Sequence, residues 1–479
     1  MAGSRGAERI LNNDKTQFDK EQTDLVKFLL NERYFKPWKL HQTYTVDENL
    51  FNYSLFGEST LEIYLTAQCN QKCEYCYLHR YSDLYPAKYD NPNIILHNLQ
   101  LLFNYLIEQN LYIPTIEFFT GEIWHSNFGL QVLDMTFDAC KKGLRTDSIM
   151  IPSNCSFVAN EIQLCEIQRR IDAFSRQGVR LIFSISIDGA PIETEARPLN
   201  NGWVKDDNFY ERLFLFAQHN TYYFHPMVAA CDVEKWIDNY KWWESQCLKY
   251  DMDPDEVVMM LEVRNNDWTP EKEKSYCDFI NYLIDRQWEK HHGDLISFTK
   301  DIFNYNGDGL HGYIPYAPAQ ADTFAGCTVA NSLTIRVGDL AICPCHRTAY
   351  NQFLYGHFIV KDDKIVDIEG YNPQMAMRIL MSNINLTNFG CDTCLFAPYC
   401  LKGCFGSQYE NTGDPFMPVQ CVCDFFKTKL TFIVQKFEDL GVNEYLRKNV
   451  DPAEEWYNRV NEWLKFVERV KKNAKLSNY

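Results

Sequence analysis

Residues 59–80 read STLEIYLTAQCNQKCEYCYLHR, and this stretch decides the fold. Residues 59–67 have the β-branched and aromatic content of a strand, and Cys69, Cys73 and Cys76 follow it in one short loop. Proteins built from βα units collect their active-site residues on loops that leave the C-terminal ends of strands. Three thiolates from such a loop can hold three irons of a cubane cluster and leave one iron open to a chelating small molecule. A structural zinc loop is the alternative, and His79 could then supply the fourth ligand.

Beyond this loop, strand-like and helical segments alternate. The expected strands are 59–67, 115–120, 148–153, 179–187, 222–230 and 257–263, and helices are expected from about residues 95, 126, 158, 206, 232 and 270. This alternation predicts an α/β fold with a parallel sheet and right-handed crossovers. Six units favour a partial (β/α)6 TIM-like barrel over a closed eight-fold one, and a doubly wound open sheet is the competing arrangement.

Composition excludes several classes of protein. The chain has 479 residues, 46% of them hydrophobic, which is too apolar for a disordered chain, and its net charge of −17 argues against nucleic-acid and anionic-membrane partners. The N-terminal residues have no apolar run of a secretory signal, and no stretch approaches the roughly 18 apolar residues of a membrane span. We therefore expect a cytoplasmic protein whose 18 cysteines are reduced, and we interpret their spacing in terms of metal or redox chemistry rather than disulfides.

The cysteine spacing CxxxCxxC, with the aromatic Tyr75 before the last cysteine, resembles the hallmark of the radical S-adenosylmethionine (SAM) superfamily. The resemblance implies a [4Fe-4S] cluster on Cys69, Cys73 and Cys76 whose open iron binds SAM. Later segments match the family's SAM-contacting motifs in order: Thr120-Gly121-Glu122 in place of Gly-Gly-Glu, Ser153-Asn154-Cys155, and Ser186-Ile187-Asp188-Gly189 followed by Arg197. The SAM contacts implied by this resemblance are Tyr75, Gly121, Glu122, Ser153, Asn154, Ser186, Asp188 and Arg197.

A second group of cysteines lies between residues 327 and 423. Its spacing resembles the SPASM extension of radical SAM proteins, which binds two auxiliary [4Fe-4S] clusters, so three clusters are expected in all. The resemblance implies Cys327, Cys343 and Cys404 for the first auxiliary cluster, and Cys391, Cys394, Cys400 and Cys423 for the second.

Two ligand assignments in this extension are open. Cys345 competes with Cys343, or joins it, because Cys345-His346-Arg347 matches the context of the ligand in related peptide-modifying proteins. Cys423 is preferred to Cys421 because the Asp-Phe-Phe-Lys after it resembles the family's aromatic-Lys run. A zinc ribbon is the alternative for the whole module. The scattered cysteines Cys140, Cys155, Cys165, Cys231, Cys247 and Cys277 are interpreted mainly as core residues.

These motifs predict a radical SAM oxidoreductase that modifies a ribosomally made peptide, for example by a thioether or carbon-carbon crosslink. The expected partners are the peptide and an electron donor such as flavodoxin or ferredoxin. Residues 1–57 lack the pattern of a leader-binding domain, so either a separate protein recognises the leader or the substrate has no leader. A sulfatase-maturase-like enzyme, a small-molecule dehydrogenase and a non-catalytic iron-sulfur carrier or sensor are the alternatives. Pro344 and His346, which follow Cys343 and Cys345, stand where sulfatase maturases often have an Asp, and this lowers the first alternative.

The expected domain order follows these motifs. It comprises an N-terminal helical or docking extension (1–57), the partial barrel (58–290), a bridging region (291–320), the SPASM domain (321–425) and C-terminal helices (426–479).

Overall fold

The structure is a computed structural model of the whole chain. The residues that it describes are 60–82, 90–119, 121–189, 196–197, 208–304, 333–369, 391, 394–397, 399–400, 404–415, 417–450 and 457–476. The predicted N-terminal extension, Thr120 and Cys327 lie outside the described residues.

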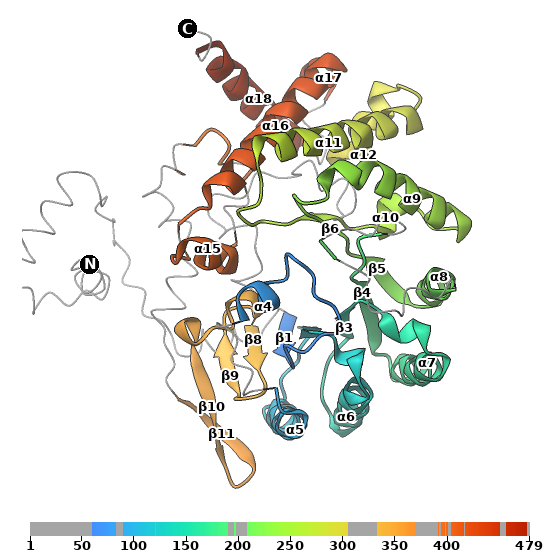
Figure 1. Ribbon diagram of the computed structural model, residues 1–479, viewed down its shortest axis with the longest axis vertical. Coiled ribbons are helices and arrows are strands. Elements are labelled where there is room, and N and C mark those ends of the chain that lie inside the picture. Colours follow the sequence, from blue (N-terminus) through green and yellow to red (C-terminus); the bar gives the residue numbers. More distant parts are fainter. Residues whose placement is uncertain are drawn as a thin grey trace, which may run out of the picture.

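A large sheet forms the centre of the molecule (Figure 1). Its first strands in the chain are β1 (Thr60–Tyr64), β2 (Thr115–Phe119), β3 (Ser148–Ser153), β4 (Arg180–Ile185) and β5 (Thr221–Phe224). They lie side by side in chain order and pair in parallel, with Thr60 opposite Thr115 and Ser148 opposite Arg180. A mixed α/β fold with a large parallel sheet is therefore confirmed.

Helices connect these strands and lie along the outer side of the sheet in Figure 1. They are α5 (Pro92–Glu108), α6 (Phe128–Lys142), α7 (Glu161–Arg176) and α8 (Phe209–His219). Local sequence fixes their ends: Asn91 accepts hydrogen bonds from the first-turn amides of α5, and Pro92 occupies its first position. The helix α6 ends at Gly143, whose left-handed backbone is available to glycine at little cost.

Alternation along the strands separates the two faces of the sheet. Leu61 and Ile63 of β1 are buried in the main apolar core, whereas Tyr64 belongs to a second buried cluster. Glu62 and Glu117 stand opposite each other on β1 and β2, between residues that face the main core. The face turned away from the main core therefore has polar side chains in mid-strand.

The expected fifth and sixth strands are shorter than predicted. The segment 222–230 divides into β5 and β6 (Met227–Val228), which pairs with β7 (Leu261–Glu262) in a separate two-stranded parallel sheet. The break falls at His225-Pro226, where proline has no amide proton to donate, and the next amide, of Met227, donates to Asp188 Oδ1 at 2.8 Å. Sequence periodicity does not reveal that competing side-chain acceptor.

Between these short strands the chain is helical. The elements are η5 (Val233–Lys235), α9 (Trp236–Lys249), α10 (Pro254–Val257) and, after β7, α11 (Pro270–Lys290). Helix α12 (Leu295–Asn304) follows, in the region expected to be an irregular bridge. Phe298 of α12 packs against Trp288 and Phe437, and this tertiary contact accounts for a helix that the glycine-rich sequence around it does not suggest.

The later part of the chain returns to the central sheet. β8 (Leu333–Arg336) pairs in parallel with β1, and β9 (Ala341–Cys343), β10 (Gly356–Lys361) and β11 (Lys364–Glu369) extend the sheet in antiparallel fashion. The 3-10 turns η8 (His346–Thr348) and η9 (Asn351–Phe353) lie between β9 and β10. Segments far apart in sequence thus meet at β1.

Within the described residues after 404, the helices are α15 (Phe405–Thr412), α16 (Gln420–Asp439), α17 (Val442–Asn449) and α18 (Tyr457–Leu476). Helix α16 packs on the segment after β7, where Phe425 stacks on Trp268 with ring centroids 4.0 Å apart, and Lys429 forms a buried ion pair with Glu262. Among the described residues, none of the helices combines the length and apolar character needed to traverse a bilayer.

Candidate functional site

The loop after β1 carries Cys69, Cys73 and Cys76 at the C-terminal edge of the sheet, as the sequence predicts. The amide of Gln71 donates to Cys69 Sγ at 3.3 Å, and Cys76 is the N-cap of the short helix α4 (Tyr77–Arg80). Burial raises the pKa of Cys69 to about 12 and that of Cys73 to about 11, and neighbouring thiols of the same loop add to both shifts. The three sulfurs are therefore grouped closely enough to influence one another.

The loop after β2 packs directly against this cysteine loop. Gly121 has φ +57°, and a Cβ there would lie 2.3 Å from the carbonyl oxygen of Gln68. The amide of Glu122 donates to the same carbonyl oxygen at 2.8 Å. Only glycine combines this backbone conformation with so close an approach, so Gly121 sets the distance between the two loops.

Glu122 joins the second loop to the third. Its buried carboxylate accepts hydrogen bonds from the Ser153 hydroxyl at 3.1 Å and from the Asn154 amide at 2.7 Å. It also accepts from the amide of Trp124. Burial raises the pKa of Glu122 to about 7, although these donors favour its ionised form. In this arrangement Glu122 orients the loop after β3.

Asparagine side chains connect the third loop back to the first. Asn154 Nδ2 donates to Asn70 Oδ1 at 2.7 Å, and Asn70 Nδ2 donates to Ser156 Oγ at 2.8 Å. The amide of Ser156 in turn donates to Asn154 Oδ1 at 2.9 Å. Sequence analysis identified Asn154 but missed Asn70 and Ser156, although the position of Asn70 beside Cys69 is a signal that could have pointed to it.

The fourth loop supplies a charged group to the same edge. Tyr75 donates its hydroxyl hydrogen to Asp188 Oδ2 at 3.0 Å, and Arg197 forms an ion pair with Asp188 Oδ1 at 3.0 Å. Arg197 also lies over the Tyr75 ring and beside Cys73, where its charge opposes the effect of burial on the thiol pKa. A buried cation beside a thiol stabilises the thiolate form that metal binding requires.

Ser186 and the residues around Asp188 complete the site. The Ser186 amide donates to the Ser153 carbonyl oxygen at 2.7 Å, so its backbone links the third and fourth loops. Asn239 and Trp243 both donate to the Asp188 carbonyl oxygen, and neither residue was expected in the site. Burial, with a smaller contribution from Arg197, lowers the pKa of the nearby His225 to about 4, which keeps the imidazole neutral.

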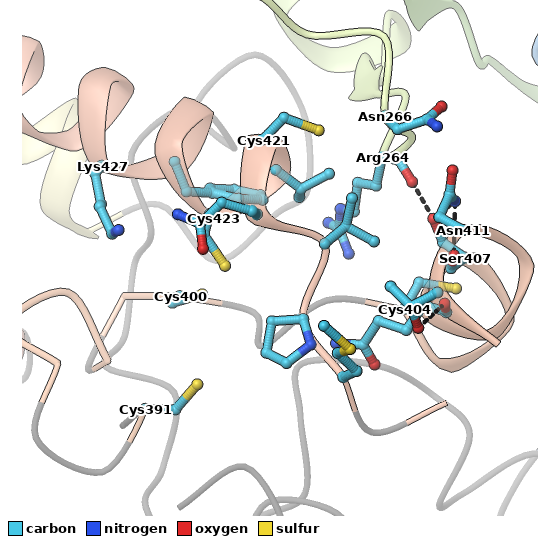
Figure 2. A pocket seen from close by; sticks show the side chains of 18 of the residues that line it. Arg264, Asn266, Cys391, Cys400, Cys404, Ser407, Asn411, Cys421, Cys423 and Lys427 are labelled. Atoms are coloured by element: carbon cyan, nitrogen blue, oxygen red, sulfur yellow. Dashed lines mark hydrogen bonds between the residues drawn. The ribbon is translucent and has the colours of Figure 1, made fainter. Parts of the chain in front are cut away.

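A second group of cysteines lines a cavity of about 680 Å³ beside α15 and α16 (Figure 2). Cys391, Cys394, Cys400 and Cys423, the four residues expected to hold the second auxiliary cluster, all line it. Burial raises the pKa of Cys423 to about 12, and the charges of Cys400 and Cys391 add to this shift, so these thiols are neighbours. Lys427 lies beside Cys394 and Cys423.

Cys421 and Cys423 differ in orientation although both line this cavity. In Figure 2 the Cys423 sulfur points toward the region of Cys391, whereas the Cys421 sulfur points away from it. Cys421 Sγ lies 3.6 Å from the carbonyl oxygen of Asn265, to which it donates. The geometry therefore favours Cys423 over Cys421 as the partner of Cys391 and Cys400.

Cys343 and Cys345 lie beside the central sheet. Cys343 is fully buried at the end of β9, and Cys345 is the N-cap of η8, with its sulfur 3.3 Å from the Thr348 hydroxyl. Cys404, the N-cap of α15, lines the same cavity as the second group of cysteines and also lies close to Arg347 of η8. The structure thus brings the η8 segment, which follows Cys345, next to Cys404, while Cys343 belongs to a separate apolar cluster.

The donor set suits iron-sulfur chemistry. Thiolates are the usual ligands of [4Fe-4S] clusters, and both cysteine groups are partly shielded from solvent. In the part of the chain that the structure describes, no three His, Cys, Asp or Glu side chains surround the position of a single metal ion. The second group of cysteines surrounds the cavity beside α15 and α16, an arrangement that suits a cubane, whose ligands are spread over several irons.

Solved structures share this fold. The chain is similar to the anaerobic sulfatase maturase anSMEcpe with bound AdoMet, with a TM-score of 0.52 and 12% identity over 80% of this chain and 98% of that one. It is similar to the same maturase with AdoMet and the Cp18Cys peptide, with a TM-score of 0.50 and 11% identity over 80% and 99% of the two chains. The expected resemblance to the SPASM-domain radical SAM proteins is confirmed at the level of the fold.

The sequence comparisons found no match. No protein-family model matches the sequence, and no curated protein matches it significantly.

Proposed function

We propose that this chain is a radical SAM oxidoreductase that modifies a ribosomally made peptide. The observation that carries the proposal is the edge of the sheet where the Cys69–Cys76 loop contacts three further loops. Gly121, Glu122 and Asn154 join it to the loops after β2 and β3, and the Tyr75 hydroxyl joins it to Asp188 after β4. A cluster-binding loop and three further loops meet at the carboxyl ends of parallel strands, where βα enzymes bind their ligands.

In this proposal Cys69, Cys73 and Cys76 hold a [4Fe-4S] cluster and leave one iron for SAM. A reduced cluster held there would supply the electron for cleavage of SAM to methionine and a 5′-deoxyadenosyl radical, and that radical would take a hydrogen atom from the substrate. The protein's own contribution is to place SAM and exclude water. We assign the SAM contacts to Tyr75, Gly121, Glu122, Ser153, Asn154, Ser186, Asp188 and Arg197.

These residues differ in their structural roles. Glu122 accepts hydrogen bonds from three groups of its own chain, so in addition to its proposed SAM contact it orients Ser153 and Asn154. Arg197 and Asp188 form a buried ion pair beside Cys73, which fixes the position of the Tyr75 ring. Gly121 brings the second loop close to the cysteine loop.

We further propose two auxiliary clusters in a SPASM domain over residues 321–425, after a partial (β/α)6 barrel over 58–290. Cys391, Cys394, Cys400 and Cys423 are the ligands of one, and the cavity that they share supports this assignment. Cys327, Cys404 and either or both of Cys343 and Cys345 are the ligands of the other. Such clusters are suited to accept the electron that a two-electron oxidation of a peptide releases.

The partners of this reaction are a peptide and an electron donor such as flavodoxin or ferredoxin, with a leader-recognition protein. A peptide substrate is supported by the likeness to the maturase solved with the Cp18Cys peptide. A sulfatase-maturase-like reaction is the second candidate, because the same likeness favours it.

The test is SAM cleavage by the anaerobically reconstituted, reduced protein. We expect 5′-deoxyadenosine by liquid chromatography, and an iron-sulfur carrier would produce none. Short peptides encoded beside the gene are then added, and a crosslink or other oxidation appears as a mass loss of two hydrogens. A product from a sulfatase-derived peptide alone would favour the second candidate.

A further inference from the structure

Gln71 stands out within the cysteine loop because its side chain is buried without being satisfied. The residue is 3% exposed, and within the described residues its Nε2 atom has no hydrogen-bond acceptor. A buried donor without a partner costs about 1–3 kcal/mol, so such a group indicates an acceptor that is absent from the bare polypeptide.

The rest of Gln71 is held firmly. Its amide donates to Cys69 Sγ at 3.3 Å, and its carbonyl oxygen lies 3.0 Å from His79 Nε2 of α4. The end of the side chain reaches the second cysteine, because Cys73 Sγ lies 3.9 Å from Gln71 Oε1 and donates its thiol hydrogen to it. One residue therefore contacts two of the three cysteines, through its backbone and through its side chain.

Iron at Cys73 would change the sulfur at this contact from a hydrogen-bond donor to an acceptor. A ligating thiolate has lost the thiol hydrogen and accepts hydrogen bonds, so Oε1 would face another acceptor. A half turn of the carboxamide exchanges its oxygen and nitrogen within nearly the same volume. That turn gives the thiolate sulfur an N–H donor and gives the buried Nε2 group its missing acceptor.

We propose that, in the loaded protein, the Gln71 side chain donates an N–H···S hydrogen bond to Cys73 and raises the reduction potential of the cluster. This rests on the proposed cluster at Cys69, Cys73 and Cys76. A hydrogen bond to a cluster sulfur stabilises the reduced, more negative state. Gln71 is thus a positioning and tuning residue that makes the cluster easier to reduce by its physiological donor.

The test compares Gln71→Leu with the wild-type protein and with Gln68→Leu, which alters an exposed glutamine of the same loop. The readout is the midpoint potential of the reduced cluster whose electron paramagnetic resonance signal changes when SAM is added. Gln71→Leu should retain its iron and show a more negative midpoint, and Gln68→Leu should match wild type. An unchanged midpoint in Gln71→Leu at full iron content overturns the inference.

A second variant is needed in case Gln71→Leu does not retain the cluster. Gln71→Asn keeps the amide but is one methylene too short, so its midpoint should also be more negative. If both variants lose the irons of this cluster, Gln71 holds the loop rather than tunes the cluster, and the inference is wrong.

The same experiment separates this inference from the proposed function. The proposed function itself is refuted if wild type shows no signal that responds to SAM, or if that signal persists in Cys73→Ala. A signal that is present, disappears in Cys73→Ala and does not shift in Gln71→Leu refutes only the role of Gln71.

Discussion

The loop edge of the parallel sheet and the cysteine cavity beside α16 both bring cysteines together, but the contacts that hold those cysteines differ. At the sheet edge, backbone and side chains interlock, and a methyl group at Gly121 would already overlap the Gln68 carbonyl oxygen. At the second site, Cys391, Cys394, Cys400 and Cys423 line a cavity of about 680 Å³. The first site is therefore shaped by the polypeptide, whereas the second depends on what fills it.

The largest expected effect is at the sheet edge. Cys73→Ala removes a ligand of the proposed SAM cluster. Loss of a residue that only hydrogen-bonds to a metal ligand typically lowers activity by about 10- to 100-fold, so loss of the ligand itself should lower SAM cleavage at least about 100-fold. The measurement is 5′-deoxyadenosine formed by the reduced protein. Cleavage close to the wild-type rate would show that this loop does not hold the cluster.

The matched change at the cavity should separate the two chemistries. In Cys394→Ala, SAM cleavage remains measurable because the sheet edge is intact, while modification of the peptide collapses. Circular dichroism and iron counts on the same sample show whether the module is folded. Full product formation with about eight irons, from two remaining [4Fe-4S] clusters, would remove the cavity from the reaction.

Chelation of iron should loosen the cavity but not the sheet. We expect amides of α15 and the first turn of α16 to exchange at least about tenfold faster, equal to about 1.4 kcal/mol of local stability. The amides of β1 to β4 keep their protection, because the main apolar core covers them. Hydrogen exchange read by mass spectrometry measures both, and equal loosening of the two regions would contradict the comparison.

Gly121→Ala tests how tightly the sheet edge is packed. Alanine in the left-handed region and its overlap with the Gln68 carbonyl oxygen should together cost about 2–5 kcal/mol of unfolding free energy. Gly178→Ala is the control, because Gly178 also has positive φ but has nothing within 4 Å of a built Cβ. Equal losses of stability in the two variants would show that the close contact between the loops is unimportant.

A further effect, confined to one side chain and to high pH, concerns the pH dependence of the sheet. Burial, with the charge of Glu62, raises the pKa of Glu117 from 4.5 to about 7, so its contribution to stability is full below pH 4.5 and is lost as the pH rises through 7. Glu117→Gln should therefore gain up to about 3 kcal/mol over wild type at pH 8, and little at pH 4.5. Thermal unfolding against pH measures this, with the exposed Glu211→Gln as control. A pH-independent difference would refute the assignment.

The sequence predicts the sheet edge better than it predicts the rest of the site. Cys69, Glu122, Asn154 and Asp188 each follow a strand, so strand periodicity is enough to bring them to one edge. The position of Asn70 beside Cys69 places it near the site, but the sequence does not reveal its hydrogen bond to Asn154, which lies 84 residues away.

Other features escape prediction because they depend on tertiary contacts. The parallel pairing of β8 with β1 joins segments some 270 residues apart, and local pattern contains no information about such a partner. The break after β5 falls at Pro226, which the sequence shows, but Asp188 also accepts the Met227 amide hydrogen there, and that contact cannot be read from the sequence. At the cavity, spacing alone could not separate Cys421 from Cys423, since the two lie on the same helix and differ in where their sulfurs point.

Iron and sulfide content after anaerobic reconstitution tests the central claim most directly. Three [4Fe-4S] clusters predict about twelve irons and an equal amount of sulfide per chain, with the broad visible absorbance of iron-sulfur proteins. A stable, folded preparation that holds about two zinc ions and shows no such absorbance would contradict the account.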